Sequence, residues 1–470
     1  MHSAEGAQAP SHREIVSMPF SRYLKIFPDL DRPGSTLLYS TRKGSLVRLP
    51  EKILADVRRG TLADTVVDTL RRLELWVDDP AAEREAMVEL VNRTNAKAGT
   101  FFATVVLTLD CNLACPYCFE DHFRGNHAMG AATAGLLVEK IEREELGQGR
   151  DVTLRFYGGE PLLALPRLKE IACRLRAAAA ATGTKFSFSL VTNATLLTRK
   201  VVEELLPLGL TSAQVTLDGP AEIHDLQRPF VSGHGSFTAI VANIQAVCDL
   251  ITLKPGGNFT RENYRRFPEM LDALLAAGID PARLGPVQFS PILPKSGVRD
   301  SSSDCCVSCG EPWLMEAILF LREETLKRGF GVEKPAMGVC MVELTNNLVV
   351  NYDGTLYKCP AFMGWPEMAV GTLADGVGDY AVSHNLDLWK NDDCLECAYL
   401  PLCFGGCRLL PLLNHGVINR VDCRKEFYDT TLERFILQDC RSHTAKSGST
   451  TCHGPSSSAM RSKVASCFTE

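Results

Sequence analysis

The sequence lacks any apolar run approaching the roughly 20 residues that a helix needs to span a bilayer. It also lacks a basic start followed by an apolar core, so no secretory signal peptide is predicted. Neither sign of charge dominates: the 470 residues carry a net charge of -6. This balance argues against nucleic acid or a membrane surface as partner. We therefore expect a cytoplasmic protein with more than one domain.

Cysteine, in contrast, is abundant, with 18 residues. In a reducing compartment such usage points to metal binding rather than disulfides. Cys111, Cys115 and Cys118 directly follow an apolar run, residues 104–110, that is typical of a buried strand. Three thiolates at one strand end leave a coordination position open on an iron site. A zinc site completed by His122 or His127 is the alternative.

The spacing C-x3-C-x2-C, with Tyr117 before the last cysteine, resembles the signature of the radical S-adenosylmethionine (SAM) enzymes. The resemblance implies that Cys111, Cys115 and Cys118 hold a 4Fe–4S cluster and that SAM chelates its fourth iron. The rest of the chain should then supply a SAM site near these cysteines.

The chain after residue 99 alternates strands and helices, which predicts a parallel sheet covered by helices. The predicted strands are 104–110, 152–157, 186–191, 213–217, 251–254 and 286–292. The predicted helices are 131–145, 165–181, 199–208, 236–249, 264–277 and 312–328. We interpret the chain as α/β, with a partial (β/α)6 radical SAM barrel over residues 100–330. Functional groups of such barrels collect where strands run into the following loops.

Polar motifs follow the second, third and fourth predicted strands. By resemblance to radical SAM enzymes, the run Gly158-Gly159-Glu160-Pro161 would hold the SAM amino group. Thr192 and Asn193 are suited to bind a ribose or carboxylate, or else form a capping turn. Arg228 would be a partner of the SAM carboxylate or a structural residue, and Asp218 would line the substrate side. Taken alone, each motif could be an ordinary turn.

Residues 17–99 predict a small α+β unit. Strands are expected at 23–27, 36–39 and 45–49, helices at 51–59 and 62–72, and a helical linker at 80–98. The unit resembles the leader-recognition element of peptide-modifying enzymes, which binds a peptide as an added strand. A plain N-terminal cap is the alternative. Residues 1–16 are expected to be a disordered leader.

The C-terminal third carries a second cysteine array, beside a hairpin predicted to turn at Asp353-Gly354. Its order resembles the cysteine-rich SPASM extension, which binds two auxiliary 4Fe–4S clusters; two zinc ribbons are the alternative. The resemblance assigns residues 331–440 to this domain, with one cluster on Cys394, Cys397, Cys403 and Cys423, and the other on Cys340, Cys359 and Cys407. The second set has either an open site or a fourth ligand among Cys305, Cys306 and Cys309.

Pro360 follows Cys359 at the position where sulfatase maturases carry an acid/base Asp. This difference favours another peptide oxidation, in which a ribosomal precursor peptide is cross-linked through a thioether or carbon–carbon bond. Among such maturases the geopeptide type has the most similar layout; formylglycine formation on a sulfatase is the alternative. A flavodoxin- or ferredoxin-type protein would supply the electron. A helix is predicted over 425–438, and a disordered tail over 441–470.

Overall fold

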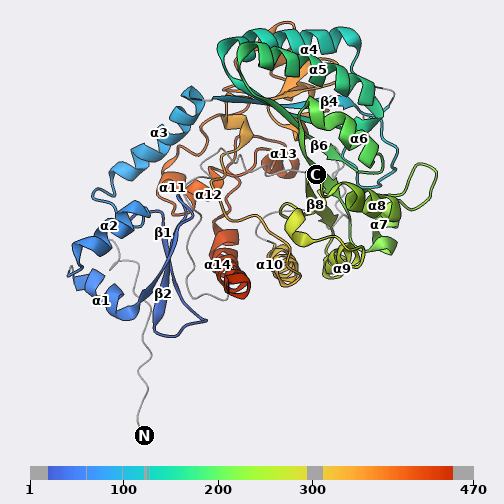
Figure 1. Cartoon of the computed structure of the whole chain (residues 1–470). Helices are drawn as coiled ribbons and strands as arrows, with labels where there is room; N and C mark the ends of the chain where they lie inside the picture. Colours follow the sequence, from blue (N-terminus) through green and yellow to red (C-terminus); the bar gives the residue numbers. More distant parts are fainter. Residues whose placement is uncertain are drawn as a thin grey trace.

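The computed structural model describes residues 20–59, 61–97, 99–120, 124–125, 127–293 and 311–447 (Figure 1). These residues form two sheets. One is a three-stranded sheet in the order β1-β2-β3. The other has ten strands in the order β13-β12-β11-β10-β4-β5-β6-β7-β8-β9. The predicted leader over residues 1–16 lies outside the described residues.

Six parallel strands form one side of the large sheet, from β4 to the edge strand β9, which confirms the predicted α/β barrel. They are β4 (Thr100–Thr108), β5 (Asp151–Gly158), β6 (Phe186–Thr192), β7 (Leu210–Thr216), β8 (Thr252–Phe259) and β9 (Gln288–Pro291). The helices between and after them are α4 (Ala131–Glu144), α5 (Leu165–Thr182), α6 (Arg199–Leu205), α7 (Ala221–Gln227), α8 (Phe237–Val247), α9 (Pro268–Ala276) and α10 (Pro312–Lys327). The short helix α7 was not predicted.

The strands are apolar on both faces because each face is covered. Alternate residues of a strand point to opposite sides. Val105 and Leu107 belong to the core between sheet and helices, together with Leu154. Val106 belongs to a second core inside the barrel, which it shares with Val349 of the C-terminal cysteine-rich region (residues 331–440). The barrel interior is therefore filled in part by that region.

The C-terminal cysteine-rich region continues the barrel sheet. Strands β10 (Asn347–Val350) and β11 (Thr355–Tyr357) form the predicted hairpin, and Gly354 takes the positive φ of +91° that its turn requires. Strand β10 also pairs in parallel with β4, placing Val349 opposite Thr104. The remaining elements are β12 (Gly371–Thr372), β13 (Gly376–Val377), α11 (Asp392–Leu395), α12 (Leu400–Cys403) and α13 (Leu409–His415).

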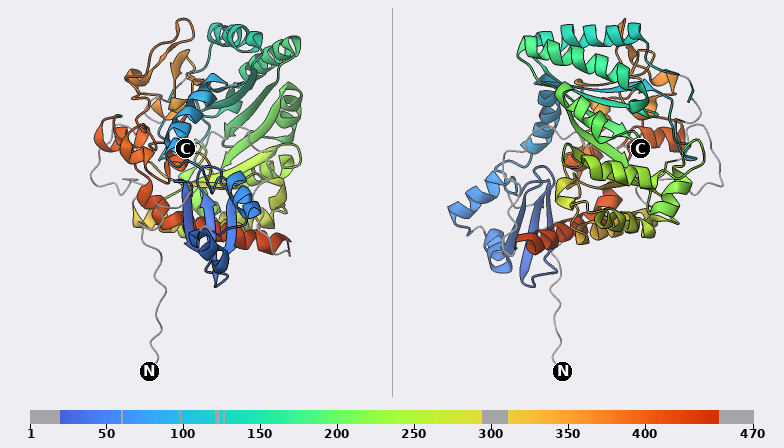
Figure 2. Two further views of the ribbon diagram at one scale, coloured as in Figure 1. Left: turned by 90° about the vertical axis from the view of Figure 1, so that its left-hand side faces the viewer. Right: turned by 45° about the vertical axis from the view of Figure 1, so that its right-hand side comes forward.

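The N-terminal unit contains the predicted strands and helices. Its antiparallel strands are β1 (Leu24–Pro28), β2 (Ser35–Ser40) and β3 (Leu46–Pro50), followed by α1 (Glu51–Arg59), α2 (Asp64–Arg72) and α3 (Ala82–Ala96). Phe27 and Leu37 pack against Tyr399 and Leu432 in one buried cluster. The unit thus rests on the C-terminal part of the chain rather than on the barrel strands, as Figures 1 and 2 show.

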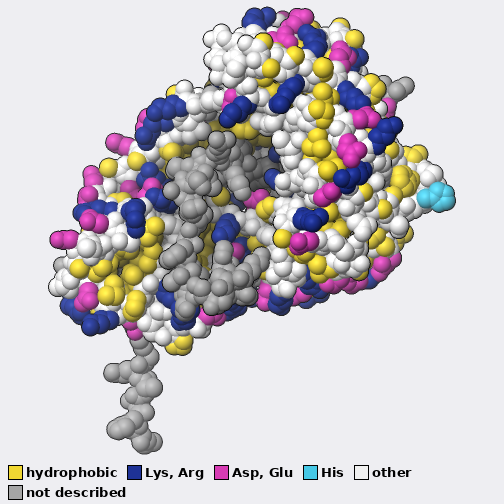
Figure 3. All heavy atoms as spheres, viewed as in Figure 1, with side chains coloured by type: hydrophobic (Ala, Val, Ile, Leu, Met, Phe, Trp, Pro, Cys, Tyr) yellow, Lys and Arg dark blue, Asp and Glu magenta, His cyan; other side chains and the backbone are white. Residues whose placement is uncertain are grey.

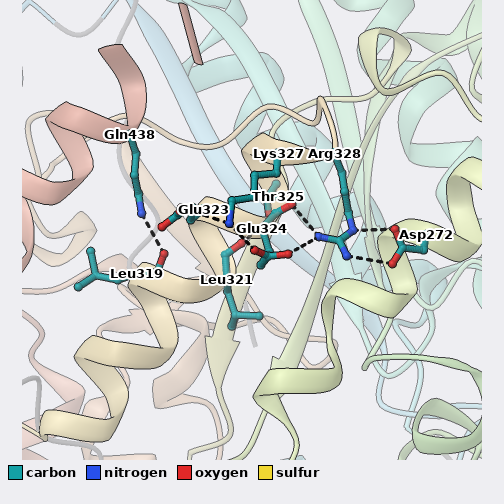
Figure 4. A network of polar contacts seen from close by, with 9 residues as sticks. All are labelled: Asp272, Leu319, Leu321, Glu323, Glu324, Thr325, Lys327, Arg328 and Gln438. Atoms are coloured by element: carbon teal, nitrogen blue, oxygen red, sulfur yellow. Dashed lines mark hydrogen bonds and ion pairs between the residues drawn. The ribbon is translucent and has the colours of Figure 1, made fainter. Parts of the chain in front are cut away.

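Helix α14 (Lys425–Ser447) runs past its predicted end at Gln438. The disordered tail predicted from residue 441 is therefore wrong for residues 441–447, and residues 448–470 lie outside the described residues. The extension has a physical cause, because Ile436 and Cys440 are buried against the N-terminal sheet. Side chains also tie α14 to α10: Gln438 Nε2 donates to the carbonyl of Leu319 at 3.0 Å (Figure 4).

Helix α10 is anchored on its other side to α9. The guanidinium of Arg328, just after α10, donates to both carboxylate oxygens of Asp272, at 2.7 and 3.0 Å (Figure 4). Its remaining Nη atom donates to Glu324 at 2.6 Å. Such a bidentate pair adds directional order as well as attraction. Helix α10 therefore links the barrel to α14.

The visible face in Figure 3 mixes Lys and Arg with Asp and Glu, without a large area of one sign. No helix among the described residues is both long and apolar enough to cross a membrane.

We expect Leu154→Ala to lower the free energy of unfolding by about 2–5 kcal/mol, because the fully buried Leu154 lies between sheet and helices. Leu136→Ala is the matched control: Leu136 is 44% exposed on α4, and its loss should cost less than about 0.5 kcal/mol. Urea unfolding of both variants measures the difference. Equal losses would contradict the assigned core.

Candidate functional site

The sequence motifs meet at one edge of the parallel sheet, where β4, β5, β6 and β7 end. A cavity of about 1280 Å³, counting the part open to solvent, lies at the barrel interior. Its walls include all three cysteines of the first motif together with Gly159 and Arg228. Residues of the C-terminal cysteine-rich region form another part of the wall: Pro360, Ala361, Trp365, Leu409 and Leu413.

The cysteine loop after β4 is held by backbone contacts to the segment after α7. The amide of Ala114 donates to the carbonyl of Pro229 at 2.8 Å, and the amide of Val231 donates to that of Asn112 at 3.0 Å. Burial raises the pKa of the Cys111 thiol to about 11. Arg124 donates to the carbonyls of Cys111 and Leu113, at 3.2 and 2.8 Å. The loop is therefore braced on both sides.

The glycine pair after β5 is required by close backbone contact. A Cβ on Gly158 would lie 2.1 Å from the carbonyl oxygen of Thr108, and one on Gly159 would lie 2.3 Å from that of Asp110. Gly158 also has a φ of +131°, which side chains with a Cβ rarely adopt. The turn that was predicted to hold SAM thus packs directly against the start of the cysteine loop.

Glu160 is fully buried and joins two of the predicted motifs. Its carboxylate accepts from the Leu162 amide at 3.0 Å, the Thr192 hydroxyl at 2.9 Å and the Asn193 amide at 2.8 Å. Burial raises the pKa of Glu160 to about 7. Pro161, also buried, begins the short helix that follows. The carboxylate is therefore a connector between β5 and β6.

Asn193 extends this connection to the cysteine loop. Its side-chain amide donates to Asn112 Oδ1 at 2.8 Å and lies 3.7 Å from the Cys111 sulfur. The structure thus brings Gly159, Glu160, Thr192 and Asn193 together with Cys111, as the sequence predicted.

Asp218 does not line the cavity, in contrast to its predicted position on the substrate side. Its carboxylate is fully buried and accepts from the Asn258 amide at 2.7 Å and from the Tyr117 hydroxyl. Arg228 does line the cavity; it donates to the Tyr117 hydroxyl at 2.6 Å and pairs with Asp218 at 3.8 Å. Burial raises the pKa of both Tyr117 and Asp218.

Tyr117 and Asn258 belong to this network, a position that the sequence motifs did not indicate. A signal was present for Asn258, since it follows a glycine pair at the end of β8. A Cβ on Gly257 would lie 2.0 Å from the carbonyl oxygen of Leu217, so β7 and β8 approach closely there. Tyr117 was noted only as the aromatic residue of the cysteine motif.

Several of the C-terminal cysteines lie close enough for their thiols to affect one another. The thiols of Cys340 and Cys359 are near enough to Cys407 to raise its pKa further, although burial is the larger cause. Burial raises the pKa of Cys403 to about 12, and the neighbouring Cys397 and Cys394 add to the effect. Burial also raises the pKa values of Cys394 and Cys397, and the neighbouring Cys423 raises them further.

The donor set fits iron–sulfur clusters. All described cysteines are free thiols. No three His, Cys, Asp or Glu side chains among the described residues converge on a single metal ion. In a 4Fe–4S cluster each cysteine binds a different iron, so the sulfurs need not meet at one point. Buried thiols that crowd one another need a cationic group to become thiolates, and the irons would provide it.

Other candidates from the sequence lie elsewhere. His127 is exposed and stacks on the ring of Tyr352, with centroids 5.0 Å apart, and does not line the cavity. Cys173, exposed on α5, and Cys440, buried in α14, lack ligand spacing in the sequence and are not expected to bind a cluster. The trio Cys305, Cys306 and Cys309 falls outside the described residues, as do His122, Cys452 and Cys467.

Glu160 should make the stability of the SAM-free protein depend on pH. Its folded pKa of about 7 lies above the usual 4.5, so the folded state holds the proton more tightly than the unfolded chain. Protonated Glu160 stabilises the folded state fully below about pH 4.5. This stabilisation, roughly 3 kcal/mol in total, is lost as the pH rises to about 7. Glu160→Gln should remove this slope.

Urea midpoints between pH 4.5 and 8 measure the effect, compared with Glu139→Gln at an exposed glutamate of α4. Because the glutamine also loses one acceptor, the slope is compared and not the absolute stability. An unchanged slope in Glu160→Gln would contradict the assignment.

Known proteins match this chain over the residues that form the site. The Radical SAM superfamily model matches residues 105–274. A serine-type anaerobic sulfatase-maturating enzyme of Klebsiella aerogenes is 25% identical over 325 residues, which are 63% of this chain and 76% of that protein. A cysteine-type enzyme of Clostridium perfringens is 24% identical over 332 residues, 63% of this chain and 86% of that protein.

Two solved structures have the same fold. Native anSMEcpe with bound AdoMet has a TM-score of 0.57 at 20% identity, covering 71% of this chain and 98% of that one. Streptococcus suis SuiB bound to precursor peptide SuiA has a TM-score of 0.50 at 13% identity, covering 86% and 98%. The chain therefore contains a radical SAM domain, is homologous to the anaerobic sulfatase maturases, and is an oxidoreductase-type enzyme that uses 4Fe–4S and SAM.

Proposed function

We propose that this enzyme oxidatively modifies a ribosomal precursor peptide by forming a thioether or carbon–carbon cross-link. The observation that carries the proposal is the composite cavity: the cysteine loop after β4 and the segment after Cys359 face the same space. A substrate in this cavity would touch the cysteine loop and, on the other side, residues that follow Cys359 and Cys407 in the chain. The sulfatase-maturating relatives act on sulfatases by their names, and SuiB was solved with its precursor peptide.

The cysteines would hold three clusters. Cys111, Cys115 and Cys118 would bind the cluster that carries SAM. Two auxiliary clusters would be held by Cys394, Cys397, Cys403 and Cys423, and by Cys340, Cys359 and Cys407, whose fourth position is open or filled by a residue outside the described ranges. When bound, these groups supply hydrogen-atom abstraction and take up the electron released as the new bond closes.

Residues of this chain position the reactants. The turn over Gly158 and Gly159 would bring backbone within reach of the SAM amino group, and Arg228 would face the SAM carboxylate while it braces Tyr117. Apolar side chains line much of the cavity and would exclude water from the peptide, among them Val191, Ile292, Leu293, Trp365, Leu409 and Leu413. The peptide loses two hydrogen atoms overall: one is transferred to SAM-derived carbon, and the other leaves as a proton and an electron.

The N-terminal unit is proposed to bind the leader of that peptide. In its β1-β2-β3 order, β1 and β3 each have one side that is unpaired within the sheet. An extended peptide can add to such an edge through main-chain hydrogen bonds. An external flavodoxin- or ferredoxin-type protein would donate the electron that starts each turnover, and a cytoplasmic location stays a prediction.

Formylglycine formation on a sulfatase is the second candidate, because the homologous enzymes are named as sulfatase-maturating enzymes. Pro360 weighs against it. This residue follows Cys359 and lines the cavity, but it has no group that can accept a proton.

Replacing Cys111, Cys115 and Cys118 together by Ala should abolish 5′-deoxyadenosine formation from SAM in the reduced enzyme. Iron content should fall by roughly a third, since one of three clusters is lost. Cys173→Ala, at an exposed cysteine of α5, is the control and should change neither value. Chromatography of the reaction and iron analysis give both readouts. Retained SAM cleavage in the triple variant would rule out the assignment.

Incubation with a small cysteine-rich precursor peptide encoded beside this protein should give a product lighter by two hydrogen atoms, with no formylglycine. A sulfatase-type peptide carrying the target Cys or Ser should remain unmodified under the same conditions. Mass spectrometry distinguishes the two. Formylglycine in the sulfatase peptide would favour the second candidate instead.

A further inference from the structure

Arg155 in β5 is a cavity residue that the proposed chemistry does not use. Its guanidinium lines the cavity, and no described carboxylate or hydrogen-bond acceptor contacts it. The other cavity arginines are engaged. Arg228 binds Tyr117 and Asp218, and Arg124 donates to backbone carbonyls of the cysteine loop. Arg155 thus differs from them in having a cationic group directed at the cavity and available to a ligand.

The position of Arg155 separates it from the SAM motif. It lies three residues before Gly158 on β5, so the two are about 10 Å apart along the strand. Its neighbour across the β4 ladder is Thr104, which also lines the cavity. Pro360 and Trp365, from the C-terminal cysteine-rich region, line the same space. Arg155 therefore faces the interior of the barrel, away from the strand ends.

The charge of Arg155 is uncompensated in these surroundings. Burial lowers the pKa of its guanidinium, and no neighbouring charge among the described residues offsets this effect. In particular, no described cysteine contributes to the shift of its pKa. Among the described residues, the cavity wall carries three arginines and one carboxylate, Glu120. An arginine remains charged in such a site, so an anionic ligand would be attracted strongly.

We propose that Arg155 forms a carboxylate-binding subsite and selects a peptide substrate by a carboxylate near the residue to be modified. The planar guanidinium offers paired N–H donors that match the two oxygens of a carboxylate. The carboxylate belongs to an acidic side chain or to the C-terminus of the peptide, and the test distinguishes these. The inference rests on the proposed function in assuming that the ligand is a peptide.

The test measures equilibrium binding to the reconstituted holoenzyme with SAM, by dialysis and mass spectrometry. The probes are acetylated pentapeptides of Ala. One pair has Glu or Gln in the centre with an amidated end, and the other pair has a free or amidated C-terminus. Arg155→Gln and Arg155→Lys are compared with Arg174→Gln, at an exposed arginine of α5.

The unaltered enzyme should bind the carboxylate member of one pair about tenfold more tightly than its neutral partner. Arg155→Gln should reduce that ratio to about one, Arg155→Lys should keep part of it, and Arg174→Gln should keep all of it. The pair that shows the preference identifies the source of the carboxylate. Iron and sulfide content, together with thermal unfolding, verify that each variant folds and carries its clusters.

Equal binding within both pairs by the unaltered enzyme would overturn the proposal, as would a preference that survives Arg155→Gln. A loss of SAM affinity in Arg155→Gln would assign the guanidinium to the SAM carboxylate and would also overturn it. The proposed function fails separately, if SAM cleavage occurs but no peptide is modified. The binding ratios do not depend on that result.

Discussion

The geometry of the site depends on one close backbone contact, between the glycine turn after β5 and the end of β4. Gly158 and Gly159 lie so near to the carbonyls of Thr108 and Asp110 that no side chain would fit between them. The same contact is fixed by hydrogen bonds, since the amides of Gly159 and Glu160 donate to those carbonyls at 2.9 and 2.8 Å. The distance between the cysteine loop and the turn proposed to bind SAM is therefore set by main chain and not by adjustable side chains.

Buried polar side chains extend this rigidity across the sheet. Glu160 joins β5 to β6, and Asn193 joins β6 to the cysteine loop. Tyr117 returns from that loop to Asp218 and Asn258 at the ends of β7 and β8. Each member is satisfied by another, which is the condition under which a buried polar network specifies a single arrangement. The loop is held at several points, so its three cysteines keep their relative positions.

Much of this arrangement could be predicted from sequence because it follows from local patterns. Strand–helix alternation predicted the barrel, and motif order placed the cysteines, Gly158 to Pro161 and Thr192-Asn193 at adjacent strand ends. Asp218 was misplaced because sequence order gives the strand end but not the direction of a side chain. The position of Arg155 was missed for the same reason: a single arginine within an apolar strand has no distinguishing spacing. The length of α14 depended on tertiary burial of Ile436 and Cys440, which periodicity alone does not reveal.

The parallel pairing of β10 with β4 has a consequence for how the protein can be divided. A strand at the edge of a sheet exposes unpaired amides and carbonyls, which promote association with other chains. Because β10 covers the edge of β4, the barrel has no such exposed edge on that side. Removing the C-terminal cysteine-rich region would uncover the strand that leads to Cys111 and would open the core around Val106. The boundary near residue 330 therefore separates two sequence patterns, whereas the folded sheet continues across it.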